Sequence, residues 1–533
     1  MENMIQDPRL LPKNDLKENT SMNSVIFQQV QPVAPLSRTT QQIEFQVPAN
    51  SNGLIDLAGS YITSGAELYY TANAVPPLTE LAGQSYIPPA VNGEFAWGNS
   101  VSFKEFLGST LFRDVKIYLN GVEVNDIHPQ LSSQASFYKR LLQDKGNNGN
   151  GFTYCAPTLG VETISINTAT ESADIDFSMK AKTNGWKGAE GADYDANIGA
   201  MRNIQQGSAP PVGAKGSESK DYSSIRTLGM MRLNFAKATP ATPFEVLTKL
   251  QDGINKQSAF LPANVDIRVV LTLNTNEQVV YNNDAINRPV GYSLINSTLW
   301  IKRGFPTPSA MAVFNRSLAD APLSYPITMT KSTMRSITAG SATINETNLL
   351  NGVVPDRVLV AFKDKGALTT GDHRFSQYIS TGVEGSGQGD SAGNLYQNVI
   401  TSLYVNANGR QYPQRQYDLG FNSSKNNSVN NIRPYMDYVN TWSSHNDVFP
   451  DDTPPISYEA WCSNYKVFVV DLRDDGLNEN ELTTDLNNRG SIEVVATQQN
   501  NTGNVVAVEM FVMGIYNAEV IIDANRNVSK VGF

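Results

Sequence analysis

Apolar and polar residues alternate along much of this chain, and a period of two is typical of half-buried β-strands. Residues 43–47 show it plainly, because Ile43, Phe45 and Val47 alternate with Glu44 and Gln46. Other β-rich runs, separated by Gly, Asn, Asp and Pro, occupy residues 54–72, 114–124, 228–235, 263–274, 292–305, 325–339, 354–364, 399–413, 465–474, 490–499, 504–516 and 518–528. Many short strands with turn signals between them predict sandwiches or barrels rather than a βαβ sheet.

Helical patterns are few. Residues 132–143 place apolar side chains on one face of a short helix. Residues 242–257 begin with Thr-Pro, a pair that suits a helix start, and a third helix is expected near 309–318. The dipeptide Asn120-Gly121 predicts a type I′ hairpin turn, since both positions tolerate positive φ.

The chain of 533 residues is too long for one hydrophobic core, so at least two are expected. The strand-then-helix pattern near residue 308 predicts two consecutive antiparallel β domains. We assign residues 1–36 to an N-terminal arm, either disordered or gripping a neighbouring subunit, 37–308 to the first domain and 309–533 to the second. Gly-rich or polar stretches predict large inserted loops at 144–222 in the first domain, and near 371–394 and 422–460 in the second.

Charge and composition narrow the possible partners. Charged residues make up only 17% of the chain, the net charge is -10 and the pI is about 5.0. Without a Lys/Arg-rich run, such a chain does not attract phosphate backbones by its overall field, so we expect no direct sequence-specific binding of nucleic acid. Contact with a membrane stays open.

The sequence also bears on the compartment. The two cysteines, Cys155 and Cys462, exclude a disulfide framework and fit a reducing compartment such as the cytosol or nucleus. The N-terminus shows no apolar signal-peptide core. The most apolar stretch, 505–522, contains Glu509, Asn517 and Glu519, so we interpret it as two strands joined by a turn.

Candidate catalytic and metal-binding motifs fail on their spacing. His128, His373 and His445 have no metal-ligand partner nearby and are expected in exposed loops. The run that begins at Asp471 resembles a calcium loop but has Arg473 where the loop needs an oxygen ligand. The Gly-rich segment 383–394 lacks the GK[ST] of a phosphate loop. The sequence therefore predicts no catalytic residue, no cofactor and no metal, and a protein that is not an enzyme.

Four groups of segments match one family in order and spacing: 110–124, then 295–327, then 351–364 with 399–421, and finally 465–475 with 518–528. The matching residues are Leu111, Phe112, Val115, Leu119, Asn120, Gly121, Tyr325, Pro326, Pro355, Asn408, Gly409, Pro413, Asp471 and Asp523. Together they resemble the major capsid proteins of Polinton-like viruses, adintoviruses and virophages. These proteins belong to the double jelly-roll lineage that includes adenovirus hexon. The segment 371–394 departs from the family pattern.

The resemblance implies two eight-stranded jelly rolls in one chain and a homotrimer that looks hexagonal. Such capsomers tile an icosahedral shell around a DNA genome, contact neighbouring capsomers, and meet penton and minor or cement proteins. The protein would be made in the host cytoplasm or nucleus and end in the virion. The arm 1–36 would then lie inside the shell, and the insertion 144–222 would form much of an outward tower.

Three other classes remain open from the residues alone. A glycan-acting enzyme or lectin-like β-sandwich would need paired carboxylates or a metal constellation, and none is recognisable. A secreted adhesin would need a signal peptide. A minor capsid or penton protein usually has a single jelly roll, and the length of this chain argues against that.

Overall fold

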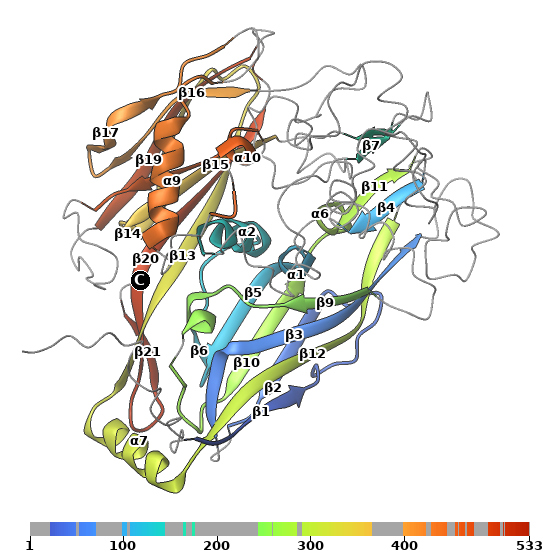
Figure 1. Ribbon diagram of the computed structural model, residues 1–533, viewed down its shortest axis with the longest axis vertical. Helices are drawn as coiled ribbons and strands as arrows, with labels where there is room; N and C mark the ends of the chain where they lie inside the picture. Colours follow the sequence, from blue (N-terminus) through green and yellow to red (C-terminus); the bar gives the residue numbers. More distant parts are fainter. Residues whose placement is uncertain are drawn as a thin grey trace, which may run out of the picture.

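A computed structural model gives the fold of the chain (Figure 1). It describes residues 22–49, 53–70, 99–103, 107–143, 164–166, 173–175, 244–257, 259–284, 290–364, 398–422, 428–444, 454–456, 458–463, 466–473, 489–500, 505 and 507–531. The expected strand at 228–235, most of the insertion 144–222, the insertion 371–394, Cys155, His373 and His445 lie outside these ranges.

The first half of the chain forms two facing four-stranded sheets. One has the spatial order β1 (Met22–Val30), β12 (Val290–Pro306), β3 (Leu54–Tyr70) and β9 (Phe244–Thr248). The other has the order β2 (Gln42–Val47), β10 (Ile267–Leu273), β5 (Phe112–Leu119) and β6 (Val122–Glu123). All these pairings are antiparallel.

The second half repeats this arrangement. One sheet has the order β13 (Leu323–Ile337), β20 (Val508–Ile522), β15 (Arg357–Asp364) and β18 (Val467–Asp471), and β21 (Val528–Val531) pairs with β20. The other has the order β14 (Thr343–Val353), β19 (Arg489–Gln499), β16 (Val399–Ala407) and β17 (Arg410–Asp418).

The two halves share one topology. If the eight strands named for each half are counted in chain order, without β21, both halves read 1-8-3-6 in one sheet and 2-7-4-5 in the other. Two facing antiparallel sheets of eight strands with such crossed connections define a jelly roll. The predicted all-β fold of two consecutive jelly rolls is therefore confirmed.

Smaller elements extend this frame. The two-stranded ribbons are β4 (Asn99–Phe103) with β11 (Val280–Asp284), and β7 (Ile164–Ile166) with β8 (Ala173–Ile175). The helices are α1 (Leu107–Thr110), α2 (Ser132–Gln143), η4 (Gly253–Lys256), α6 (Asn276–Val279), α7 (Pro308–Asp320), α9 (Ile432–Ser444) and α10 (Tyr458–Ser463). Two expected helices, at 132–143 and near 309–318, are confirmed as α2 and α7. α9 falls within the expected insertion 422–460, and α10 begins inside it and ends just beyond it.

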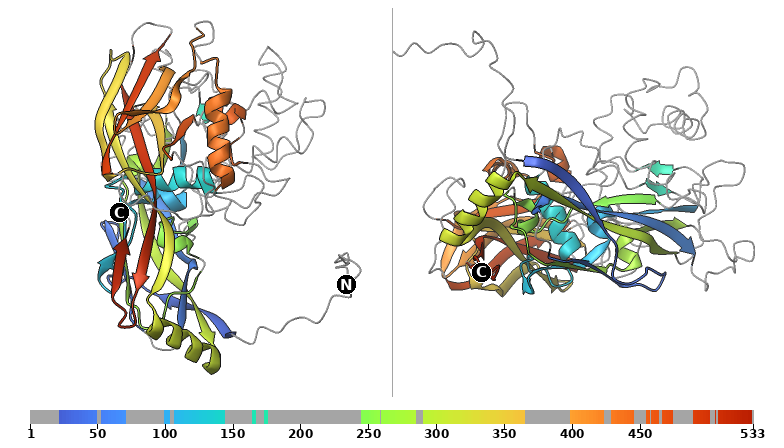
Figure 2. Two further views of the ribbon diagram at one scale, coloured as in Figure 1. Left: turned by 90° about the vertical axis from the view of Figure 1, so that its left-hand side faces the viewer. Right: turned by 90° about the horizontal axis from the view of Figure 1, so that it is seen from below.

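The long axis of the molecule runs through both halves, and α7 connects them at the end farthest from α9 (Figures 1 and 2). From α7, β13 runs alongside the first half before it enters the second sheet system, and β20 returns along the same path. The length of these two strands lets the second half of the chain contribute side chains to both cores.

The two expected cores exist, and each takes residues from both halves. Buried side chains of β13 and β20 join the first core, among them Tyr325, Met329 and Val520. Conversely, Phe137, Tyr138 and other residues of α2 lie in the second core. Full burial of a large apolar side chain contributes about 1.5–3 kcal/mol to the stability of the fold. The side chains that each half buries in the core of the other therefore hold the two halves together strongly.

Three sequence predictions are wrong in ways that burial explains. Residues 22–30, assigned to the arm, form β1, and β12 supplies their hydrogen bonds. The expected helix at 242–257 is β9 followed by the short η4, because Phe244–Thr248 pairs with β3 and buries Val246. The expected turn inside 505–522 is absent, since β20 continues through Asn517 while β13 pairs along its whole length.

Candidate functional site

The described residues in which the two jelly rolls meet form a buried junction, which we treat as the candidate functional site. It has three parts: a polar cluster between β6 and β13, the helix α2, and a pair of turns at the end of the first half that lies near α7. Each part joins segments far apart in the sequence. The junction decides how rigidly one jelly roll is held against the other.

We define the polar cluster as Asp126, His128, Lys139, Asp252 and Thr330, all buried. Asp126 accepts a hydrogen bond from Lys139 Nζ and another, at 2.7 Å, from Thr330 Oγ1. The backbone N–H of Asp126 donates to Asp252 Oδ1 at 3.0 Å. Lys139 Nζ also donates to the carbonyl of Gln251 at 3.1 Å. The cluster thus connects the β6–α2 loop, α2, the segment before η4, and β13.

The backbone beside the cluster connects the same elements. Ile127 N–H donates to the carbonyl of Thr330, and Ser332 N–H donates to the carbonyl of Ile127, both at 3.0 Å. His128 fits between the halves, with Nδ1 2.8 Å from Ser332 Oγ and Nε2 2.9 Å from Thr330 Oγ1. The expectation that His128 lies in an exposed loop is therefore wrong, because two hydroxyls of β13 satisfy its ring nitrogens inside the protein.

Burial and neighbouring charges raise the pKa of one group in the cluster and lower the pKa values of two others. Burial alone would raise the pKa of Asp126, but the Lys139 ammonium and the hydrogen bond with His128 outweigh it and hold that pKa well below its usual range. Burial, with Asp126 nearby, raises the pKa of Asp252 to about 6. Burial, together with the Lys139 charge, lowers the pKa of His128 to about 4.

The signs of the last two shifts give a testable pH dependence. Because the folded pKa of Asp252 is raised, its proton stabilises the fold as pH falls from about 6 towards 3.8. Because the folded pKa of His128 is lowered, its protonation destabilises the fold as pH falls from 6.5 towards about 4. In the unaltered protein the two effects largely cancel across this window.

Single substitutions should reveal each effect. Relative to the parent, the unfolding free energy of Asp252→Asn is expected to fall by about 2 kcal/mol between pH 6.5 and pH 4, and that of His128→Gln to rise by a similar amount. Denaturant titrations across this window measure both. Parallel pH profiles for the two variants would contradict the assignment.

The second part of the junction is α2. Tyr138 stacks on Phe511 of β20, with ring centroids 5.0 Å apart. Lys363 Nζ lies 5.0 Å from the Tyr138 centroid and 5.4 Å from that of Phe511, a cation–π arrangement, and burial lowers the pKa of Lys363 well below its usual value. The carbonyl of Leu141 accepts a hydrogen bond of 2.8 Å from Tyr438 of α9. Thus α2 is anchored to a sheet and a helix of the second half.

The third part is a pair of turns. Asn120 and Gly121 have φ of 46° and 83°, which confirms the type I′ turn between β5 and β6. Asn120 Nδ2 donates to the carbonyl of Arg526, in the β20–β21 turn, at 2.7 Å, and Asn120 Oδ1 accepts from Asp266 N–H at the same distance. Arg526 Nε donates to the carbonyl of Ala263 at 2.8 Å. Through these hydrogen bonds the β20–β21 turn, near the end of the second half, covers one end of the first core.

The second half contains an equivalent turn. Asn408 and Gly409, between β16 and β17, have φ of 51° and 81°. Asn408 Nδ2 donates at 3.1 Å to the carbonyl of Arg489, the first residue of β19. In the first half Asn120 Oδ1 accepts from the N–H of Asp266, the residue before β10. The same dipeptide therefore makes the same hairpin and braces the same neighbouring strand in both jelly rolls.

Alanine substitutions can test this equivalence. Gly121→Ala and Gly409→Ala are each expected to destabilise the protein by roughly 1–2 kcal/mol, because a Cβ in open space meets no atom but strains a left-handed backbone. Thermal or denaturant unfolding measures the loss. Glu123→Ala, in the exposed part of the first hairpin, is the control and should change stability by under about 0.5 kcal/mol. A large difference between the two glycines would contradict the equivalence.

The structure brings together only some of the residues matched from sequence. Near the first core and its end lie Leu111, Phe112, Val115, Leu119, Asn120, Gly121, Tyr325, Pro326 and Asp523. Tyr325 donates to the carbonyl of Phe260 at 3.0 Å, and Asp523 accepts from Asn527 N–H at 2.8 Å inside the β20–β21 turn. These residues close the junction rather than line a reactive site.

The other matched residues lie in the second half: Pro355, Asn408, Gly409, Pro413 and Asp471. Pro355 packs near Gly514, and Pro413 lies in β17, at the edge of its sheet. Asp471 ends β18 and accepts from Arg473 N–H at 3.0 Å and from Arg357 Nε at 3.3 Å. The arginines therefore occupy the carboxylate that resembled a calcium ligand.

The sequence did not single out Asp126, Lys139, Asp252 or Thr330. Among the described residues, no group of three or more His, Cys, Asp or Glu side chains is placed to hold a metal ion, and no helix is long and apolar enough to cross a membrane. What the junction can do is mechanical: it fixes two jelly rolls as one block.

Two jelly rolls joined in this way define a double jelly-roll protein. No family model matches the sequence, and no curated protein is similar to it. The structure is similar to a chain of the Sputnik virophage, with 14% identity, a TM-score of 0.52 and coverage of 100% of this chain and 93% of that chain. It also matches the mavirus major capsid protein (12% identity, TM-score 0.47, 100% and 96% coverage) and the Faustovirus major capsid protein (11%, 0.42, 95% and 91%).

At these identities the likeness establishes the fold, and the Sputnik match, with its TM-score above 0.5, carries that conclusion. The chain has the double jelly-roll fold. The resemblance seen in the sequence motifs is thus confirmed at the level of fold.

Proposed function

We propose that this protein is a major capsid protein without enzymatic activity. The observation that carries the proposal is the pair of jelly rolls of identical topology, held by one buried junction in one chain. The similarity to the Sputnik virophage chain across the whole sequence supports it. The boundary between the two jelly rolls lies near residue 308, at the start of α7, and the first jelly roll begins at β1.

Geometry explains why a double jelly roll suits a shell. Three copies around an axis present six similar domains, so a trimer with three-fold symmetry resembles a hexagon and can pack closely on a lattice. This requires the two jelly rolls of each chain to keep a fixed relative orientation. The buried polar cluster and the exchange of side chains between the cores supply that rigidity.

The proposal extends to the particle. Homotrimers tile an icosahedral shell around a DNA genome, in contact with neighbouring capsomers and with penton and minor or cement proteins. The protein is made in the host cytoplasm or nucleus and is located in the virion.

Light scattering and negative-stain imaging of the purified full-length protein test this function. We expect a mass of three chains and pseudo-hexagonal particles, with shells under assembly conditions. Compact monomers at all concentrations would contradict the proposal and favour a β-sandwich binding module or a glycan-acting enzyme.

A further inference from the structure

The edges of the four jelly-roll sheets differ in how they are protected. An edge strand exposes unpaired backbone groups, and natural proteins usually place charges or proline there to prevent pairing with another chain. Other edge strands follow this rule: Glu44 in β2, Glu123 in β6, Lys331 in β13, Asp471 in β18, Glu346 in β14, and Arg410 with Pro413 in β17. The strand β1, with the sequence MNSVIFQQV, contains neither a charge nor a proline.

β1 also exposes apolar side chains. Val25, Ile26 and Phe27 are 48%, 48% and 47% exposed, whereas the described residues of the other edge strands named above include no large apolar side chain exposed to that degree. Among the described residues, β12 alone pairs with β1, so the other edge of β1 has no strand beside it. Figure 1 shows β1 on the outer side of the first half, away from the second half.

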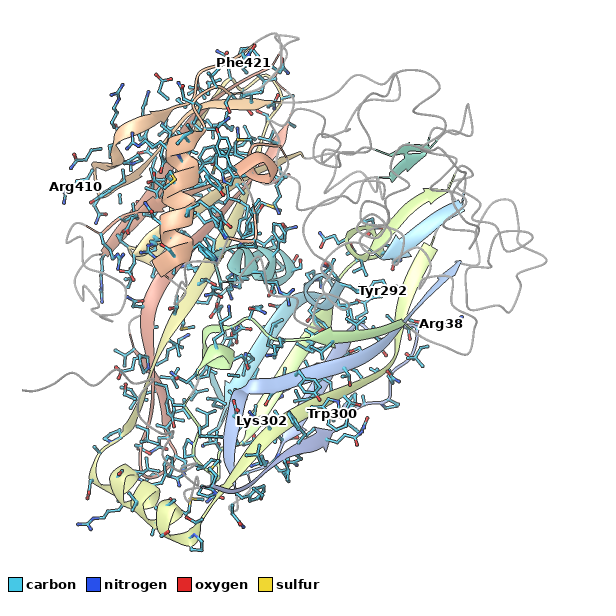
Figure 3. All side chains as sticks on the ribbon, viewed as in Figure 1. Arg38, Tyr292, Trp300, Lys302, Arg410 and Phe421 are labelled. Carbon is cyan, nitrogen blue, oxygen red and sulfur yellow. The ribbon has the colours of Figure 1, made fainter. Side chains whose placement is uncertain are left out.

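The outward face of β1 continues into an aromatic strip. Phe27 lies 5.6 Å from Tyr61 of β3, and Tyr61 lies 6.3 Å from Trp300 of β12, measured between ring centroids. Trp300 Nε1 donates to Thr63 Oγ1 at 2.9 Å, which fixes the indole, and Lys302, paired with Asp56 at 2.8 Å, borders the strip (Figure 3). An open edge thus adjoins a preorganised apolar surface.

We propose that β1 pairs antiparallel with β1 of a second copy of this chain, joining two sheets across a two-fold axis. Isologous pairing brings a surface against itself, and the absence of charge in β1 removes the like-charge repulsion that would oppose it. With Ile26 at the centre of the nine-residue strand, Val25 of one copy lies beside Phe27 of the other, so the two aromatic strips become continuous.

This inference rests on the proposed function and adds to it. A trimer with three-fold symmetry cannot use a two-fold contact within itself, so β1 joins neighbouring capsomers. One strand pair buries far less than the roughly 1,200–2,000 Å² of a stable interface, and the contact is therefore weak alone. Many such contacts in a shell would act together, which allows reversible assembly.

Charge complementation at Ile26 tests the pairing in the full-length protein. Across a two-fold axis, Ile26→Lys faces lysine and Ile26→Glu faces glutamate, so each variant alone is expected to lose association between capsomers by about tenfold or more, with trimers intact. An equimolar mixture places opposite charges together and should restore association. Val531→Lys, on β21 at 43% exposure, is the matched control and should assemble normally.

Analytical ultracentrifugation and negative-stain counts of shells measure the outcome. Two defective variants whose mixture stays defective would show that β1 binds a different partner and would overturn the proposal, as would normal assembly of either variant. A fall of several degrees in melting temperature without an assembly defect would mean that the edge is covered within one chain, which also overturns it. Failure of the unaltered chain to form trimers would instead contradict the proposed function.

Discussion

Replacing Lys139 with methionine is expected to lower the free energy of unfolding by about 3–5 kcal/mol, because it leaves the Asp126 carboxylate buried without its cation. The remaining donors, Thr330 Oγ1 and the backbone N–H of Gly253, are neutral and cannot balance the charge. His128 cannot replace the cation near neutral pH, because burial lowers its pKa to about 4. Guanidinium unfolding followed by fluorescence gives the change. The loss should be greatest near neutral pH, where Asp126 is fully ionised.

Two variants sharpen this test. Lys116→Met removes a half-exposed lysine that lies 4.0 Å from Asp114, and the cost there should stay below about 1 kcal/mol. Adding Asp126→Asn to Lys139→Met removes the unpaired charge and should recover part of the loss. Equal effects of Lys139→Met and Lys116→Met would show that the buried pair does not hold the junction.

Truncation of Tyr138 to alanine is expected to cost a similar amount, about 3–5 kcal/mol. The ring is fully buried in the second core, although its helix belongs to the first half of the sequence. The substitution leaves a cavity beside Phe511 and removes one of the two aromatic faces around Lys363. Unfolding by denaturant, with hydrogen exchange of β15 and β20, measures the loss.

Controls separate packing from other effects of the Tyr138 change. Tyr138→Phe keeps the ring and should retain most of the stability, which isolates the hydroxyl. Val313 in α7 is 66% exposed, and Val313→Ala should change stability by under about 0.5 kcal/mol. If Tyr138→Ala were as mild as Val313→Ala, α2 would not be an anchor of the second core.

The sequence predicts those elements whose signal is local. The alternation of apolar and polar residues predicted strands such as β2 and β10, and the Asn-Gly dipeptide predicted the turn after β5. The apolar face of residues 132–143 predicted a helix with the bounds observed for α2. The order of motifs then gave the fold class. Each strand, turn or helix signal is complete within the element that it predicts.

What the sequence could not show depends on distant partners. β14 breaks its alternation with two irregularities, and Asn348 and Leu350 adopt positive φ, so only pairing with β19 reveals it as a strand. Phe244–Thr248 has a helical start signal that pairing with β3 overrides. The polar cluster joins Asp126 to Thr330, 204 residues later, and no local pattern marks either residue.

The exchange of side chains between the cores has a consequence for synthesis. A nascent chain that has reached α7 carries an α2 whose apolar face has no sheet to cover it, and a first core that still lacks Tyr325 and Met329. The core is completed only when Val520, Ile522 and Val528 leave the ribosome, close to the end of the chain. A product truncated before β20 therefore leaves both cores incomplete and cannot form the pair of jelly rolls.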